Sequence, residues 1–203
     1  MATERRLWDR DYYTTRESDE QRWWILLPPV LPSGDAISEA SLIDTRQYEN
    51  TELVLPVASQ GDIPEITSLM WGVFALTHTG REAFESFSIK DLWFSPARSS
   101  SGVPLWIARP PLLSNAIDEP KAKAVREGLF PKGHPLESRS GKIRSVRSVV
   151  LRRHAIEGHD LFILADYPVF QVISKGLICK IEQSPLSGFC VETLIHPIQI
   201  SDS

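Results

Sequence analysis

The 203-residue chain has little cysteine, no long apolar run and no apolar segment at its N-terminus. Its two cysteines, Cys179 and Cys190, lie in apolar surroundings, which favours buried thiols in a reducing compartment over a disulfide. The longest nearly apolar stretch, Trp23–Leu31, is interrupted by Pro28 and Pro29 and is far shorter than the roughly 20 residues of a membrane span. The charged N-terminus is unlike a signal peptide. We therefore expect a cytoplasmic protein that does not cross a membrane.

The common catalytic and nucleotide-binding motifs GxGxxG, GxxxxGK[ST], GxSxG and HExxH are also lacking. His154 and His159 are five residues apart, so neither a helix nor a strand places both imidazoles on one face to share a metal ion. Carboxylate pairs such as Glu82 and Glu85 are typical of a solvated helix surface. We expect no catalytic residue, no metal and no cofactor, and an enzyme built on a different set of residues is the open alternative.

Composition and local patterning predict an α+β fold with a mixed sheet and flanking short helices. Hydrophobic residues make up 42% of the chain, enough for a globular core, and 15 prolines with 11 glycines favour turns over long helices. Runs rich in β-branched and aromatic residues predict strands over Arg22–Leu27, Leu53–Val57, Val73–Thr77, Leu92–Ser95, Val103–Ala108, Ser145–Leu151, Val169–Ile173 and Gly188–Leu194. Amphipathic patterns predict helices over Ile63–Met70, Thr79–Phe87, Glu119–Leu129 and Lys175–Gln183.

Two segments predict similar strand-helix-strand modules. Trp71–Gly80 aligns with Tyr167–Gly176, and each continues into an amphipathic helix and a further apolar strand. Thr79 and Glu82 form a capping-box pattern, which predicts that the first of these helices starts at Thr79. The similarity is that of a duplication or of convergence on a common turn. In both cases the strands that precede the helices are expected to be buried, with Phe74 and Phe170 in the core.

Charge is strongly segregated along the chain, although the net charge is only −4. Residues 1–50 and 51–120 each carry −4, residues 121–159 carry +7, and residues 160–203 carry −3. The basic segment fits either a solvated loop or a surface for nucleic acid, since clustered cations release counterions from a phosphate backbone. Its single aromatic residue, Phe130, argues against single-stranded nucleic acid, whose binding sites usually stack bases on several rings.

Several apolar motifs occur in one order along the chain: a strand, cap and helix, a strand ending near a proline, an aliphatic strand closing on Asp118, and a C-terminal strand-helix-strand signature. They lie at Val73–Phe87, Leu92–Pro96, Pro104–Asp118, His159–Tyr167, Val169–Ser174 and Leu186–Val191. In this order they resemble a bacterial immunity-protein family of polymorphic toxin systems that is known from myxobacterial paralogues. The resemblance covers roughly residues 63–195 and leaves residues 1–60 and 121–144 unmatched.

The resemblance implies a non-catalytic immunity protein that binds and neutralises a cognate toxin made by the same bacterium. We expect one domain overall, in which residues 1–60 add N-terminal strands to an immunity-type core at 61–203 that carries a basic loop at 121–144. Toxins of this kind are often nucleases with a basic cleft, which an acidic inhibitor surface would complement. A nucleic-acid or other anionic-ligand module that uses residues 121–153 is the alternative.

Candidate partner-binding residues lie near the N-terminus. Glu17, Asp19 and Glu20 flank Trp23 and Trp24, and aromatic residues beside charges are typical of interface hot spots. The alternative is that the two tryptophans are ordinary strand residues, with one ring buried and the other packed on a turn.

Overall fold

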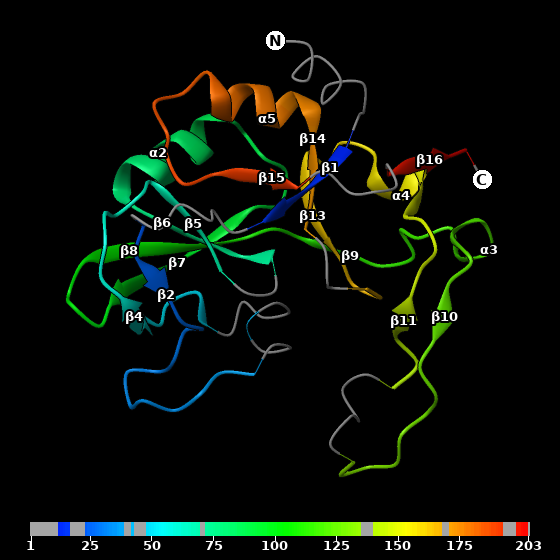
Figure 1. Ribbon diagram of the computed structural model, residues 1–203, viewed down its shortest axis with the longest axis horizontal. Coiled ribbons are helices and arrows are strands. Elements are labelled where there is room, and N and C mark those ends of the chain that lie inside the picture. The colour runs from blue at the N-terminus through cyan, green and yellow to red at the C-terminus, as the bar shows by residue number, and fades with distance from the viewer. Residues whose placement is uncertain are drawn as a thin grey trace.

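The computed structural model describes residues 12–16, 23–38, 42, 48–69, 72–134, 140–167, 171–192 and 198–202. This part of the chain has an α+β fold in which two five-stranded sheets are joined through a shared core (Figure 1). The first sheet has the order β3-β7-β8-β6-β5, and the second has the order β15-β1-β14-β13-β9. No helix in the described residues is long and apolar enough to cross a membrane. The expected fold class is confirmed.

In the first sheet, β5, β6, β8 and β7 pair in antiparallel fashion in that order. Strand β3 lies at the edge and pairs in parallel with β7. Between β6 and β7 the chain forms helix α2, His78–Ser86. The strands are β3 (Leu53–Leu55), β5 (Ile66–Ser68), β6 (Phe74–Leu76), β7 (Trp93–Ser99) and β8 (Pro104–Arg109).

The second sheet takes its strands from both ends of the chain. The N-terminal strand β1 lies between β14 and β15 and is antiparallel to both, while β9 pairs in parallel with β13 at the opposite edge. Helix α5, Lys175–Glu182, connects β14 to β15. The strands are β1 (Tyr12–Arg16), β9 (Leu112–Leu113), β13 (Leu161–Leu164), β14 (Gln171–Ser174) and β15 (Cys190–Glu192).

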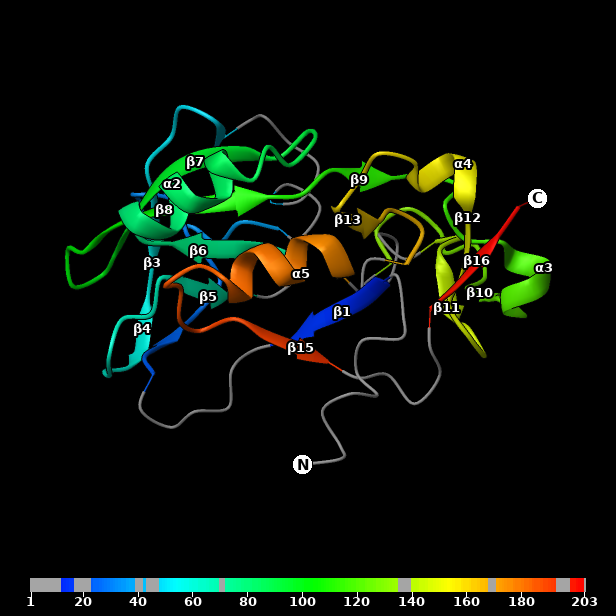
Figure 2. The same cartoon turned by 90° about the horizontal axis from the view of Figure 1, so that it is seen from above.

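Shorter elements complete the described chain. Strand pairs β2-β4 and β10-β11 are antiparallel, and β12-β16 is parallel. These elements are β2 (Ile25–Leu26), β4 (Val57–Ser59), β10 (Val125–Arg126), β11 (Ile143–Ser145), β12 (Val150–Arg152), β16 (Gln199–Ser201), α3 (Glu119–Ala122) and α4 (Arg153–Ile156). Figures 1 and 2 place β2-β4 and β10-β11 at opposite ends of the long axis.

The two sheets contain the same four-stranded unit. In each unit a two-stranded hairpin leads into a helix and a third strand, and a fourth strand lies between the strand before the helix and the strand after it. The hairpin registers agree, because Ile66 is opposite Leu76 in one unit and Leu161 is opposite Ile173 in the other. The intervening strand is β8 in the first unit, whereas β1 occupies the equivalent place in the second. This shared order and register favours duplication over convergence.

Both helices start at a hydroxyl cap in equivalent places. The Thr77 Oγ1 accepts from the Gly80 N–H, and the Ser174 Oγ accepts from the Leu177 N–H, so each satisfies a donor that the first helical turn leaves unpaired. The N–H groups of the two caps also donate equivalently, Thr77 to the Glu65 carbonyl and Ser174 to the Asp160 carbonyl. The modules are therefore related by 97 residues at their caps and not by the 96 that aligns the two glycines.

The capping-box prediction is wrong by two residues. Helix α2 starts at His78 with Thr77 as its cap. Thr77 directly follows the buried strand β6 in extended conformation, so its hydroxyl can accept from the Gly80 N–H. Glu82 instead lies 3.2 Å from the His78 imidazole on the exposed helix surface. Only glycine fits at position 80, because a Cβ there would lie 2.3 Å from the Glu65 carbonyl oxygen.

Two predicted helices are also wrong. Residues 63–70 contain strand β5, since Ile66 and Thr67 are β-branched and pair with β6. The helix predicted over Glu119–Leu129 stops after one turn at Lys123, whose left-handed backbone (φ 49°) ends it before β10. The strand predicted over Ser145–Leu151 is split between β11 and β12. Periodicity alone did not separate short strands from helix turns here.

Three apolar clusters form the core of the described residues. The central cluster takes corresponding residues from both units and lies between the sheets and under α2 and α5. Its corresponding pairs are Ile66 with Leu161, Leu76 with Ile173, and Phe84 with Ile181. A second cluster lies behind the first sheet around Leu55 and Ile107, and a third lies behind the second sheet around Leu151 and Phe162.

Phe74 confirms its predicted place in the central cluster, where it is fully buried and packs edge-on against Phe84 at a centroid distance of 5.8 Å. Phe170 lies outside the described residues. We predict that Phe74→Ala lowers the free energy of unfolding by about 3–5 kcal/mol, because the transfer and cavity terms add. Urea denaturation measures this, with Leu129→Ala as the control, since the Leu129 side chain is 88% exposed. Equal midpoints for the two variants would contradict the assignment.

Substitution of Gly188 tests how closely the two units approach each other. Its φ is +84°, and a Cβ there would lie 2.1 Å from the Ile66 carbonyl oxygen; Gly102 has φ +88° with nothing within 4 Å. Gly102→Ala is expected to cost about 1 kcal/mol from backbone conformation alone. Gly188→Ala is expected to cost about 1–3 kcal/mol more, because the units must move apart. Thermal or urea unfolding of the two variants gives the difference, and equal costs would show that the contact is soft.

Candidate partner-binding surfaces

The two predicted tryptophans lie at the β2-β4 end of the molecule, beside strand β5. Trp24 is only 4% exposed, and its Nε1 donates to Thr67 Oγ1 at 3.0 Å, so it belongs to the core behind the first sheet. Trp23 is half-buried and forms a parallel bridge with Asp62. Of the two rings, that of Trp23 is therefore the one that reaches the surface. Glu17, Asp19 and Glu20 lie outside the described residues.

Both tryptophans line a small recess together with Pro64, Ile66 and Gly188. Its volume is about 50 Å³. That is well below the ~150 Å³ that holds a benzene-sized molecule. The recess is suited to one protruding side-chain group of a partner, not to a cofactor or an organic substrate.

The segments beside this recess expose apolar side chains and carry acidic residues. Ile25, Leu27 and Ile63 are 56%, 45% and 40% exposed. Ile25 and Leu27 flank the half-buried Leu26, which packs on the same core cluster as Trp24. Described residues 23–38 and 48–69 contain five carboxylates and no lysine or arginine. We call this surface the acidic end; its carboxylates belong to Asp35, Glu49, Glu52, Asp62 and Glu65.

The basic segment forms a hairpin that projects from the other end of the molecule (Figure 1). We call described residues 123–134 and 140–147 the basic arm. Its ladder continues beyond β10 and β11, because the Glu127 N–H donates to the Lys142 carbonyl at 2.8 Å and the Phe130 N–H donates to Ser140 Oγ at 2.8 Å. The segment that the sequence predicted to be a loop is therefore a hydrogen-bonded hairpin in its described residues.

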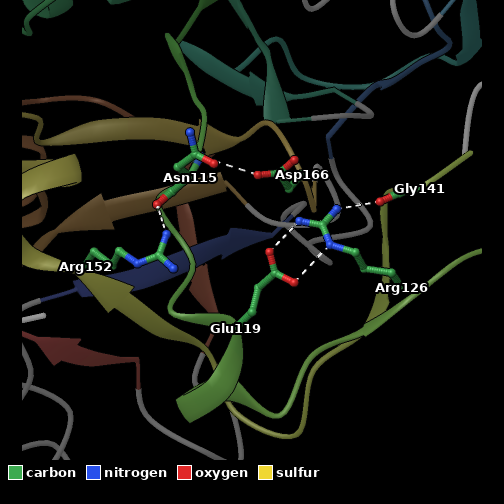
Figure 3. Close-up of polar contacts among 6 residues, drawn as sticks. All are labelled: Asn115, Glu119, Arg126, Gly141, Arg152 and Asp166. Carbon is green, nitrogen blue, oxygen red and sulfur yellow. Dashed lines mark hydrogen bonds and ion pairs between the residues drawn. The ribbon is translucent and has the colours of Figure 1, made fainter.

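Polar contacts anchor the arm at its base (Figure 3). The Arg126 guanidinium donates to both carboxylate oxygens of Glu119 and to the Gly141 carbonyl, which joins α3 to both strands of the arm. These contacts lower the pKa of Glu119, chiefly through the hydrogen bond from Arg126. On the other strand, the Ile143 N–H donates to the Asp166 carbonyl at 3.0 Å while its side chain is buried.

Nearby contacts hold the loop from which the arm starts. Arg152 donates to the Asn115 carbonyl at 2.8 Å, and the Asn115 N–H donates to Asp166 Oδ2 at 3.3 Å (Figure 3). Asn115 has φ +56°, a left-handed conformation that asparagine tolerates. The base of the arm is therefore fixed to β12 and to the end of β13.

The arm exposes both charge and apolar surface. Leu129 is 88% exposed and Val125 is 52% exposed, while Phe130 stacks on His134 at 4.8 Å. Within the described residues, five cations of the arm have no carboxylate partner, and these are Lys123, Lys132, Lys142, Arg144 and Arg147. Five exposed large apolar side chains are identified in the described chain, and all five lie in the acidic end or the arm.

Ser201 lies in a polar cluster with Asp118 and Lys121. Ser201 Oγ donates to the buried Asp118 carboxylate and accepts from Lys121 Nζ. Lys121 Nζ also lies 3.2 Å from Asp118 Oδ2, so both partners of Ser201 belong to α3 or to its cap. The cluster thus ties β16 to α3.

The other histidine and cysteine side chains that the sequence offered as candidates do not form a common site in the described residues. His159 Nε2 lies 3.5 Å from Asp91 and its ring packs edge-on to Phe162, and in the described residues no three His, Cys, Asp or Glu side chains gather to hold a metal. Cys179 and Cys190 are free, half-buried thiols. Arg109 is fully buried 4.5 Å from the Trp93 ring, and burial lowers its pKa to about 10, so it stays charged at neutral pH.

Sequence reasoning proposed Trp23 as a contact residue and did not single out the exposed aliphatic residues on either surface. Residues 23–27 are all apolar, so the sequence carried no alternation that would mark Ile25 and Leu27 as exposed. Comparison of the chain with protein-family models and with curated protein sequences finds no match.

The Glu119–Arg126 contact predicts pH-dependent order in the arm. A carboxylate with a lowered pKa contributes stability above its ordinary value of about 4.3 and loses it as the pH falls through the folded-state pKa. We expect acidification, or Glu119→Gln at neutral pH, to lower the protection factor of the Glu127 amide hydrogen, which lies in the arm ladder. Hydrogen exchange by NMR measures this, with Glu85→Gln on α2 as the control. Unchanged Glu127 protection in Glu119→Gln would show that other contacts hold the arm.

Proposed function

We propose that this protein is a cytoplasmic immunity protein that binds and neutralises a toxin made by the same bacterium, without catalysis or a cofactor. The observation that carries the proposal is the acidic end, where Ile25, Leu27 and Ile63 are exposed beside Trp23. Exposed aliphatic side chains around an aromatic ring and a small recess are suited to a protein partner. The motif order that resembles the immunity family supports the same function.

Neutralisation follows from occlusion. The carboxylates of the acidic end attract a basic toxin surface and raise the rate of encounter, and the apolar side chains then exclude water from the contact. A toxin with a basic active-site cleft would have that cleft covered. The rigid packing of Trp24 beneath this surface keeps it preorganised, which lowers the entropy cost of binding.

The unpaired cations of the arm favour the alternative function, an anionic-ligand module. A two-stranded ribbon with Arg144 and Lys142 has the shape and charge to meet a nucleic-acid groove. Its ring Phe130 is stacked on His134, however, and the arm also exposes Leu129 and Val125. Oligonucleotide titration at several salt concentrations tests this function, since phosphate contacts give a steep salt dependence.

The test of the proposed function uses the protein encoded directly beside this gene. Co-expression is expected to rescue growth from that toxin, and the two proteins are expected to co-purify. Ile25→Asp with Leu27→Asp should weaken binding by about tenfold or more, because buried apolar anchors carry most of the affinity. Isothermal calorimetry measures the change.

Leu129→Asp is the control, since it adds one negative charge to an apolar side chain of the arm that is 88% exposed, more than either Ile25 or Leu27. It is expected to keep toxin binding and rescue. No binding by the unmodified protein would refute the immunity function. Loss of binding in Leu129→Asp alone would move the toxin contact to the arm.

A further inference from the structure

The exposed apolar residues fall into two groups with opposite charge around them. Ile25, Leu27 and Ile63 belong to segments that carry five carboxylates and no lysine or arginine, and Val125 and Leu129 belong to the basic arm. Each group is a small apolar surface that water contacts unfavourably. Of the five carboxylates, Glu52 pairs with Arg98 and Glu65 accepts from Ser187, while Asp62, next to Ile63, is exposed. The charge carried by each segment attracts the other segment. The complementarity is thus present on one chain, both in polarity and in shape, since the arm projects and the acidic end carries a recess.

The two surfaces cannot meet within one molecule. They lie at opposite ends of the long axis in both views (Figures 1 and 2). The base of the arm is fixed by Arg126 to Glu119 and by Ile143 to Asp166, so the arm does not fold back across the molecule. Contact between them therefore requires two copies of the chain.

We infer that the basic arm of one copy docks on the acidic end of a second copy. The side chain of Leu129 is the apolar anchor, and Ile25, Leu27 and Ile63 with the adjacent recess receive it. Lys142 and Arg144 lie near carboxylates such as Asp62. The contact joins two different surfaces, so each added copy leaves one free arm and one free acidic end. This inference does not rest on the proposed function, because it needs no other protein.

A mixing experiment with two variants tests the docking. The arm variant carries Leu129→Asp and Arg144→Glu, and the end variant carries Ile25→Asp and Asp62→Lys. All four side chains are exposed, so the thermal midpoints should stay close to that of the unmodified protein. Each variant retains one working surface. Sedimentation equilibrium measures the mean mass as protein concentration and salt are varied.

The mean mass of the unmodified protein is expected to rise above 22.9 kDa with concentration at low salt. The rise should fall away at about 1 M salt, where screening acts within roughly 3 Å. Each variant alone should remain a monomer. Their equimolar mixture should form dimers and nothing larger, because it contains one working arm and one working acidic end for each pair.

Three outcomes would overturn the inference. The unmodified protein could remain a monomer at every concentration at low salt, the arm variant could associate as the unmodified protein does, or the mixture could remain monomeric. A monomeric unmodified protein that binds duplex DNA, with binding lost in the arm variant, would assign the arm to nucleic acid instead. Toxin rescue is measured separately, so failure of this inference is distinguishable from failure of the proposed function.

Discussion

The apolar core between the two sheets is the constraint on which the rest of the structure depends. Each sheet is small, and neither α2 nor α5 is long enough to cover it alone, so each unit must bury its inner face against the other. The contacts across the interface are reciprocal: Glu65, before β5, accepts from Ser187 after α5, while His159, before β13, lies beside Asp91 after α2. Asp91 and Gly188, 97 residues apart, both have positive φ. These loops must turn sharply because each meets the opposite unit at close range.

The four-stranded plan that the two units share accounts for the place of strand β1 in the second sheet. The first unit takes its intervening strand from β8, which follows β7 directly. In the second unit β1 takes this place from the other end of the chain, and β16, the described strand that follows β15, pairs with β12 instead. Tyr13 of β1 is accordingly 3% exposed and packs in the central cluster where Trp106 of β8 packs for the first unit. Strand β1 is therefore part of the core.

The two units differ most in what surrounds the shared core, and these differences place the proposed binding surfaces. The first unit is extended by β2 and β4, beside which Ile25 and Leu27 are exposed. The second is extended by α3, β12 and β16, whose polar ties at Asp118 and Glu119 support the arm. Charges that were separated along the chain thus become separated in space. A rigid core with divergent attachments is well suited to binding, because the surfaces are held in place before a partner arrives.

The sequence by itself determined the α+β class, the burial of Phe74, the existence of both capped helices and the segregation of charge, because each follows from residues close together in the chain. It did not determine that Ile66–Ser68 is a strand, since that depends on pairing with β6, or that the modules are offset by 97 residues. Phe74 and Phe170 look equivalent in sequence, yet the sheet register places Gln171 in the position of Phe74, where its Nε2 donates to the Gly72 carbonyl. Only tertiary packing decided that Trp24 is buried while Trp23 reaches the surface, and that the basic segment is an ordered arm. Register, strand exchange from the N-terminus and exposure all depend on contacts between residues far apart in the chain, which local pattern does not encode.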